Sequence, residues 1–311
     1  MAGLERGRCY CALGVAKGWK SGFLLNAASW AKRYNTFTTH DPKLKPCIVY
    51  LSMENTNEET IKRLWAHCFG NDSDIANYDK IQAASMLENA GLFTPNNPNS
   101  PEIIIWYRPN KSINTADLNI MLEDLKKEGR ECVLLILDYL KRIRPVEQSK
   151  ELRIELSNIT NELKTIAMEQ DIPILTAMQL NREAFKTLEE ADSFDEKVKA
   201  SDKLGASNVG ESIDIIQNVD YAFIVNKMQK RSFNDDGDLE YTDRYLFVKL
   251  IACRSKQPAI TSFRHRFKDD NDMALIEDIN LPRPVSTQTE VDFIRNRVDA
   301  NGTKTKGKRI I

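Results

Sequence analysis

Short apolar runs recur along the chain, separated by longer stretches in which apolar residues follow a helical spacing. The runs span residues 9–13, 47–52, 103–107, 132–137 and 172–177. Continuous apolar runs of this length are typical of strands that are buried on both faces, as in a parallel sheet. The pattern therefore predicts an α/β fold in which helices flank a mostly parallel central sheet.

Helical signals fill the stretches between these runs. Thr56 and Glu59 form a capping box ahead of a helix whose apolar face ends at Gly70. Further helices are expected over residues 21–33, from a Thr115 cap to Lys127, and over residues 151–170. The regular alternation of the two kinds of signal supports one α/β domain.

The remaining stretches have a weaker pattern. Residues 71–101 are polar with an amphipathic insert at 81–92, which predicts an exposed excursion. Residues 183–208 are charged and weakly periodic, so we expect a mobile loop there. Antiparallel strands are expected at the C-terminal side of the sheet, over residues 221–225 and 245–252 with a turn at 235–238, and over residues 259–267.

The periodicity is lost from Pro282 onward, and the last residues are basic. We therefore expect residues 1–281 to form the α/β domain and residues 282–311 to be a disordered basic C-terminal tail. A basic tail is suited to contact with nucleic acid, but solubility is the simpler explanation and the favoured one.

Composition narrows the class of protein. The 44 basic and 45 acidic residues give a net charge of −1, so any contact with nucleic acid must come from local basic clusters. The sequence shows no apolar run of membrane-spanning length and no signal-peptide core at the N-terminus, which predicts a cytoplasmic protein with no membrane partner. Most of the six cysteines lie in apolar runs and are expected to be reduced core residues.

A phosphate-binding loop is expected between the first apolar run and the first helix. Backbone N–H groups at a helix N-terminus have no internal partners, and the helix dipole is positive there, so this junction suits a phosphate anion. Lys20 is expected to reach the β- and γ-phosphates and Ser21 to hold Mg2+. The expected nucleotide-binding residues are Gly14, Val15, Ala16, Lys17, Gly18, Trp19, Lys20, Ser21 and Gly22.

Trp19 breaks the phosphate-loop pattern G-x-x-x-x-G-K-[ST], because it stands directly before Lys20 where the pattern has glycine. A side chain at this point costs about 1 kcal/mol or more if the backbone dihedrals are unusual. Two interpretations follow: the loop binds nucleotide with an altered geometry, or it is a degenerate strand-to-helix turn with a solvated lysine.

Two acids follow directly on apolar runs. Glu54 comes after residues 47–52, and Asp138 ends the most hydrophobic run of the chain. Ligands bind outside the carboxyl ends of strands in open α/β sheets, so Asp138 is expected to hold Mg2+. An ordinary acid at a strand end is the alternative, and the phosphate loop upstream makes it the weaker one.

The order of these motifs resembles the ATPase domain of the bacterial replicative DNA helicase (DnaB) family, which has a RecA-like fold. The resemblance covers roughly residues 1–267 and rests on five segments: CYCALGVAKGWKS, YLSMEN, LLILDYLKRI, QLNRE and SNVGESIDIIQNVD. It implies ATP and Mg2+ as cofactors and an ATP hydrolase that moves on single-stranded DNA in replication. It also implies a homo-oligomeric ring, expected to be a hexamer, with primase or a helicase loader as further partners.

The resemblance assigns roles residue by residue. It makes Glu54 the catalytic glutamate, which orients the attacking water, and Gln179 the sensor of the γ-phosphate. Arg254 and Lys256 are expected to complete the site of a neighbouring subunit, although each stands one position away from the register of the family's lysine and arginine. The residues expected to contact single-stranded DNA are Lys141, Arg142, Arg144, Arg182 and Lys186.

Departures from the family leave other interpretations open. Trp19 and the one-residue slip at Arg254 fit a degenerate nucleotide- or DNA-binding scaffold with weak or no hydrolysis, unless a bulge restores the register. A RecA-type recombination ATPase is a further alternative, which the family signatures QLNR and DYL disfavour. The sequence also lacks the family's amino-terminal helical domain, which predicts a free-standing motor domain or a fragment.

Overall fold

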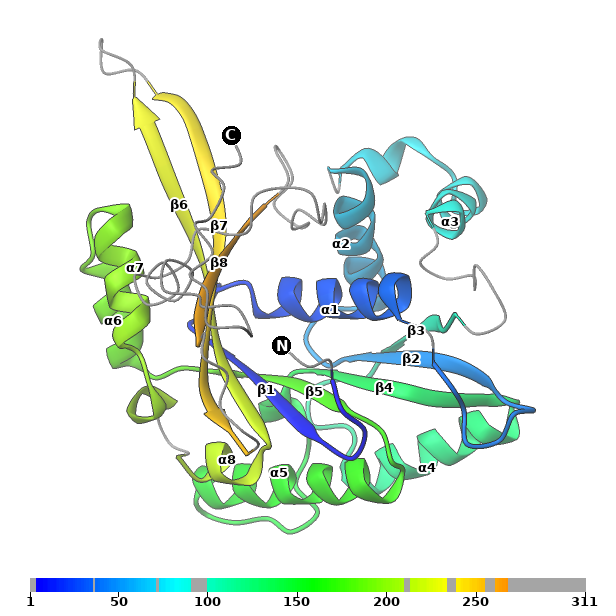
Figure 1. Cartoon of the computed structure of the whole chain (residues 1–311). Coiled ribbons are helices and arrows are strands. Elements are labelled where there is room, and N and C mark those ends of the chain that lie inside the picture. The colour runs from blue at the N-terminus through cyan, green and yellow to red at the C-terminus, as the bar shows by residue number, and fades with distance from the viewer. Residues whose placement is uncertain are drawn as a thin grey trace, which may run out of the picture.

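A twisted sheet of eight strands forms the centre of the molecule (Figure 1). The structure, a computed structural model, describes residues 4–35, 37–70, 73–90, 100–209, 213–233, 239–254 and 261–267. The strand order is β3-β2-β4-β5-β1-β6-β7-β8. The strands are β1 Cys9–Gly14, β2 Lys45–Ser52, β3 Glu102–Tyr107, β4 Arg130–Asp138, β5 Ile174–Gln179, β6 Tyr221–Phe233, β7 Leu239–Cys253 and β8 Ser262–Arg266.

The pairing confirms the predicted fold class. Strands β3, β2, β4, β5, β1 and β6 are parallel, and β7 and β8 continue the sheet in antiparallel pairing. The parallel strands carry the apolar runs, and β1 is buried along its whole length. Parallel strands join through crossovers, so their carboxyl ends lie along one edge of the sheet, where the β–α loops gather.

Helices cover both faces of the sheet (Figure 1). On one face, α1 and α2 pack through Leu24, Leu25, Leu64 and Trp65. On the other, α4 and α5 pack through residues such as Leu118, Leu122, Ile159 and Leu163. The helices are α1 Lys20–Tyr34, α2 Asn57–Phe69, α3 Lys80–Asn89, α4 Thr115–Lys127, α5 Leu152–Glu169, α6 Arg182–Glu189, α7 Phe194–Lys203 and α8 Ile213–Asn218, with short 3-10 turns η1 Ser73–Asn77, η2 Leu140–Arg142 and η3 Ala206–Val209.

The loop expected over residues 183–208 is wrong, because α6, α7 and η3 occupy it. Local capping starts both helices: Asn181 accepts from the Ala184 N–H, and Ser193 forms a capping box with Glu196. The helices bury few apolar side chains, such as Ala184 and Leu188 in α6 and Ala200 in α7, and charged residues dominate the rest of the segment. The charged composition therefore pointed to a loop although the few apolar residues lie on one side of each helix. The expected Thr115 cap is also wrong by one residue, because Asn114 is the N-cap of α4.

The β6–β7 pairing contains an irregularity near its end. Phe223 pairs with Leu250 whereas Ala222 pairs with Ala252, so Ile251 is an extra residue in β7. Such a bulge moves every following side chain of the strand to the other face. The two strands run further than the expected residues 221–225 and 245–252.

Several expectations lie outside the described residues. They concern the turn at residues 235–238, the first residues of the strand expected over 259–267, Lys256 and the tail at 282–311. Within the described part of the chain, none of the helices combines the length and apolarity that a membrane crossing requires.

Candidate functional site

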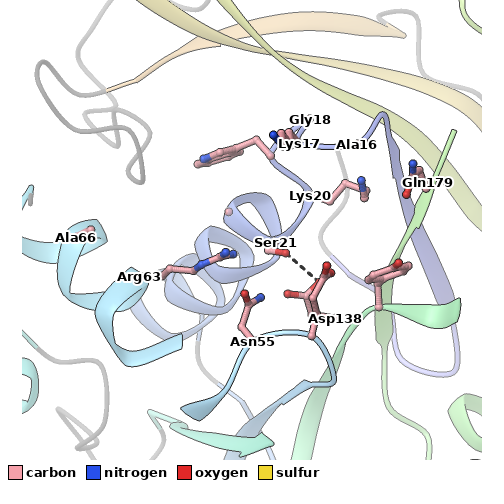
Figure 2. Close-up of a pocket in the computed structure, with 14 residues that line it drawn as sticks. Ala16, Lys17, Gly18, Lys20, Ser21, Asn55, Arg63, Ala66, Asp138 and Gln179 are labelled. Carbon is pink, nitrogen blue, oxygen red and sulfur yellow. Dashed lines mark hydrogen bonds between the residues drawn. The ribbon is translucent and has the colours of Figure 1, made fainter. Parts of the chain in front are cut away.

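A cavity of about 550 Å³ opens at the carboxyl edge of the sheet, where the loops after β1, β2, β4 and β5 meet. Figure 2 shows Ser21 and Asp138 facing each other in it, with Arg63 extending toward them from α2. The cavity is lined by Ala16, Lys17, Gly18, Trp19, Lys20, Ser21, Gly22, Glu54, Asn55, Arg63, Ala66, Asp138, Tyr139 and Gln179. The structure therefore brings together most of the residues that the sequence predicts for the nucleotide and metal site.

The loop between β1 and α1 is tightly folded. A Cβ added to Gly14 would lie 2.9 Å from the Val225 carbonyl oxygen, and one added to Gly18 would lie 2.9 Å from the Val15 carbonyl oxygen. The Gly18 N–H donates to that same Val15 oxygen at 3.0 Å. Gly14 and Val15 lie at the base of this loop, outside the lining of the cavity.

Trp19 has the dihedrals that a glycine would favour, with φ 72° and ψ 24°. A non-glycine residue in this left-handed region costs on the order of 1 kcal/mol or more. The indole packs on Gly22, where an added Cβ would lie only 2.3 Å from the ring, and its edge meets Phe267 at 4.6 Å between ring centroids. The ring is therefore held beside α1, between Gly22 and Phe267, and does not come between Ser21 and Asp138, which stay in direct hydrogen-bond contact.

Lys20 reaches back over the loop. Its Nζ donates to the Val15 carbonyl oxygen at 2.8 Å and to the Gly14 carbonyl oxygen at 3.2 Å. Burial lowers the pKa of Lys20, while Asp138 and Glu54 act in the opposite direction. A partly buried ammonium that rests on neutral carbonyl oxygens gains more from a phosphate anion, because a full negative charge attracts it more strongly than a carbonyl dipole does.

Asp138 is 1% exposed at the end of β4. Its Oδ1 accepts a hydrogen bond from the Ser21 hydroxyl at 3.1 Å, and its Oδ2 accepts one from the Tyr50 hydroxyl at 2.9 Å. Burial raises the pKa of Asp138, and the two hydroxyl donors only partly oppose that effect. A buried carboxylate next to a serine hydroxyl is an oxygen donor set of the kind that Mg2+ takes beside nucleotide phosphates.

Glu54 and Gln179 complete the cavity from two other strand ends. Glu54 follows β2 and keeps 45% of its side chain exposed, and its Oε1 lies 3.5 Å from Nη2 of Arg142. Gln179 is the exposed last residue of β5 and also lines the cavity. A carboxylate and an amide at these positions can each accept or orient a water molecule beside a bound phosphate.

Sequence reasoning missed four residues of the lining: Asn55, Arg63, Ala66 and Tyr139. Arg63 follows Glu59 by four positions, on the side of α2 that turns to the strand ends. Tyr50, which holds Asp138, was also missed. A tyrosine inside a buried run was the available signal, because its hydroxyl needs a buried partner.

The residues expected to contact single-stranded DNA lie on two segments at the same edge. Lys141 and Arg142 are in η2 and Arg144 follows it, directly after β4. Arg182 and Lys186 are exposed on α6, directly after β5. Arg144 also pairs with Asp117, at 3.6 Å between Nη2 and Oδ2.

Arg254 lies apart from the cavity, beyond the end of the antiparallel strand β7. The bulge at Ile251 brings it opposite Asp220, whose carbonyl oxygen accepts from the Arg254 N–H at 2.8 Å. Without the bulge, Cys253 would occupy that register position. The guanidinium is half exposed and its Nε lies 3.6 Å from Asp220 Oδ1.

Comparison with known proteins gives a consistent picture. A family model described as divergent DnaB-like ATPase matches residues 1–235. Replicative DNA helicases DnaB from Helicobacter pylori and Haemophilus influenzae are 28% and 23% identical over 112 and 176 residues, covering 36% and 55% of this chain. The matched regions are 22% and 35% of those relatives, so the chain spans about a fifth to a third of their length.

Two solved structures share the fold at low sequence identity. One is a separate ATPase domain, which has a TM-score of 0.61 at 17% identity; the match covers 88% of this chain and 85% of that domain. The other is a DnaB-like replicative helicase, solved in a study of its interactions with primase. Its TM-score is 0.61 at 18% identity, and the match covers 88% of this chain and 59% of the helicase.

Proposed function

The chain belongs to the divergent DnaB-like ATPase family, and we propose that it is an ATP-dependent motor that moves on single-stranded DNA in replication, in the cytoplasm. The observation that carries the proposal is the convergence of Lys20, Ser21 and Asp138 on one open cavity. The cavity lies within the size range of small-molecule sites, which is about 300–1,000 Å³.

The residues divide the work of phosphoryl transfer, which is largely positioning and charge neutralisation. The loop N–H groups and Lys20 bind the phosphates. Ser21 and Asp138 would hold Mg2+, directly or through water, and bound Mg2+ would supply positive charge beside the phosphates. Glu54 orients the attacking water and takes its proton, and Gln179 contacts the γ-phosphate and the loop that follows it.

The proposal extends to assembly. Arg254 lies away from its own cavity, so it acts, with Lys256, on the site of a neighbouring subunit. The homo-oligomer is a ring, by proposal a hexamer, whose single-stranded DNA contacts are Lys141, Arg142, Arg144, Arg182 and Lys186. One structural neighbour interacts with primase, which makes primase a candidate partner of this chain, with a helicase loader as the other.

A scaffold that binds nucleotide or DNA without efficient hydrolysis is the second candidate function. The strained Trp19 in the phosphate loop favours it, because a loop that carries this cost has departed from the usual glycine. The position of the indole beside Gly22 and Phe267 favours the motor, because the ring does not come between Ser21 and Asp138, and both residues line the cavity.

Steady-state ATP turnover, measured with and without an oligothymidylate strand, distinguishes the motor from the scaffold. The motor predicts turnover that the strand stimulates and that Glu54→Gln removes while nucleotide binding persists. Lys20→Ala should lose both turnover and tight binding. Wild-type protein that binds ATP and DNA but shows no turnover at high protein concentration would establish the scaffold instead.

A further inference from the structure

An ion pair joins the cavity to the segment expected to face DNA. Glu54, which lines the cavity, has its Oε1 3.5 Å from Nη2 of Arg142. Arg142 is the last residue of η2, which begins two residues after the end of β4. The pair therefore bridges the loop after β2 and the loop after β4, where the chemistry and the proposed strand contacts meet.

Among the described residues, Arg142 does not use all of its hydrogen-bond donors in this position. Its guanidinium lies over the Tyr139 ring at 5.3 Å, and 31% of its side chain is exposed. Its Nε is buried and has no hydrogen-bond partner in the described part of the chain. An unpaired buried donor carries a cost, and a phosphodiester would offer the planar guanidinium a stronger, two-pronged partner.

The contact with Arg142 also limits how Glu54 can bind a water molecule in the cavity. A carboxylate oxygen engaged by a guanidinium is turned toward it and is less available as an acceptor for a water molecule in the cavity. Glu54 is nearly half exposed, so nothing else in its burial requires it to stay beside Arg142. Whatever removes Arg142 frees the carboxylate to turn toward the cavity.

We propose that Arg142 is a positioning residue that holds Glu54 beside η2 when no strand is bound and releases it when a DNA backbone phosphate takes the guanidinium. Strand binding then raises the rate of hydrolysis without a change elsewhere in the fold. The inference rests on the proposed function, since it assigns to Glu54 the task of orienting water.

Arg142→Gln tests the inference, because glutamine removes the charge and keeps a polar side chain. Half-exposed ion pairs hold their partners weakly, so turnover without DNA should rise about two- to fivefold. The stimulation by oligothymidylate should shrink by a similar factor. The matched control is Lys150→Gln, which removes one exposed charge from the segment after η2 and should leave turnover without DNA unchanged.

The outcomes separate the inference from the proposed function. If the strand stimulates the wild type and Arg142→Gln leaves the rate without DNA unchanged or lowers it, Arg142 is only a DNA contact and the inference is wrong. If neither protein turns over ATP under any condition, the proposed function fails, and the inference with it. A rate of Arg142→Gln without DNA that approaches the strand-stimulated rate of the wild type would support the inference strongly.

A second variant guards against a folding defect. Arg142→Lys keeps the charge but replaces the planar group over Tyr139 with a compact ammonium. Its turnover without DNA should lie between those of the wild type and Arg142→Gln. Thermal unfolding followed by circular dichroism should show all variants folded at the assay temperature, and a rate without DNA below that of the wild type in Arg142→Lys would contradict the inference.

Discussion

Two buried aspartates at opposite edges of the sheet have contrasting surroundings. Asp138 and Asp220 are each 1% exposed. Asp220, just before β6, pairs with Lys164 and with Arg8, whose Nη1 is 3.1 Å from its Oδ1, and accepts from the Cys9 N–H at 2.9 Å. Asp138, at the end of β4, accepts hydrogen bonds from the neutral hydroxyls of Ser21 and Tyr50.

The pKa values of the two acids move in opposite directions. Burial alone would raise that of Asp220, but the bonds from Lys164 and Cys9 outweigh it and the pKa falls below its usual value. For Asp138 burial prevails and the pKa is raised. A buried acid that carries its own cations stabilises the fold, whereas one held by hydroxyls is suited to a cation that arrives with a ligand.

The largest effect is expected from Asp220→Asn. Removing one partner of a buried ion pair leaves Lys164 without its counterion and should lower the free energy of unfolding by about 3–5 kcal/mol. The lowered pKa means that the contribution of Asp220 is present above about pH 4 and is lost as pH falls through the folded-state value. Urea denaturation of the wild type and of Asp220→Asn at pH 7 and at pH 3 measures the loss in the free energy of unfolding and its dependence on pH.

Asp124→Asn is the control, because it removes an exposed ion pair with Lys127 at 2.7 Å. Exposed pairs of this kind contribute about 0–1 kcal/mol, so the control should unfold close to the wild type. If Asp220→Asn and Asp124→Asn cost the same, the assignment of Asp220 as a structural acid is wrong.

Asp138→Asn should affect activity strongly and the stability of the ligand-free protein little, which is the opposite of Asp220→Asn. The raised pKa means that ionised Asp138 costs stability once pH rises above the unfolded-state value, so asparagine should leave the ligand-free protein as stable at pH 7 or more so. ATP turnover should fall at least about 100-fold, because a metal-holding carboxylate is lost.

Thermal shift separates this role from a structural one. Wild-type protein should gain in Tm from magnesium with a non-hydrolysable ATP analogue, and Asp138→Asn should lose most of that gain. A ligand-free Asp138→Asn that melts as far below the wild type as Asp220→Asn does would remove the contrast between the two acids.

The contrast also shows what the sequence could predict. Glu54 and Asp138 were predictable, because each follows a buried run and parallel strands bring their carboxyl ends together. Arg63 was not, because its place depends on how α2 packs on the sheet, whereas Tyr50 carried a signal in its position inside a buried run. The pairing of Asp220 with Lys164 joins residues 56 apart in the sequence, and no local pattern signals it.

Helices α6 and α7 and the place of Trp19 show the same limit. The charged composition of residues 183–208 hid two helices whose caps, Asn181 and Ser193, decide where they begin. The sequence also left open whether Trp19 disrupts the phosphate loop. The answer depends on packing, which places the indole ring on Gly22. The expectation for residues 282–311 stays a prediction.

Gly22→Ala tests how far the Asp138 site depends on the loop, since Gly22 follows the Ser21 that donates to Asp138. The new Cβ would lie 2.3 Å from the Trp19 indole, so the ring must move. Overpacking of this kind costs about 1–3 kcal/mol, which should appear as a lower Tm and a weaker affinity for a fluorescent ATP analogue.

The double variant Trp19→Gly with Gly22→Ala is the control. Removing the ring removes the clash and also the left-handed strain at residue 19, so nucleotide affinity should recover. If the double variant binds no better than Gly22→Ala, the loss comes from the helix itself and not from the indole.

The smallest effect on stability is expected from His40→Gln. His40 is the partner of a third buried acid, Glu131, and it loses its positive charge as pH rises. Glu131 is buried at the start of β4; its Oε1 lies 2.6 Å from His40 Nδ1, and Asp171 lies 3.0 Å from His40 Nε2. The hydrogen bond with Glu131, and then that with Asp171, raises the pKa of His40.

The stabilisation of the fold by His40 is therefore complete below about pH 6.5 and is lost as pH rises through the folded-state pKa. Half of the imidazole is exposed, so solvent screening limits the loss in His40→Gln to about 0.5–1 kcal/mol at pH 6, with almost none at pH 9, both read from urea midpoints. An equal loss at the two pH values would show that His40 acts through packing, and Glu131 would then be a buried acid that is stable without a cation.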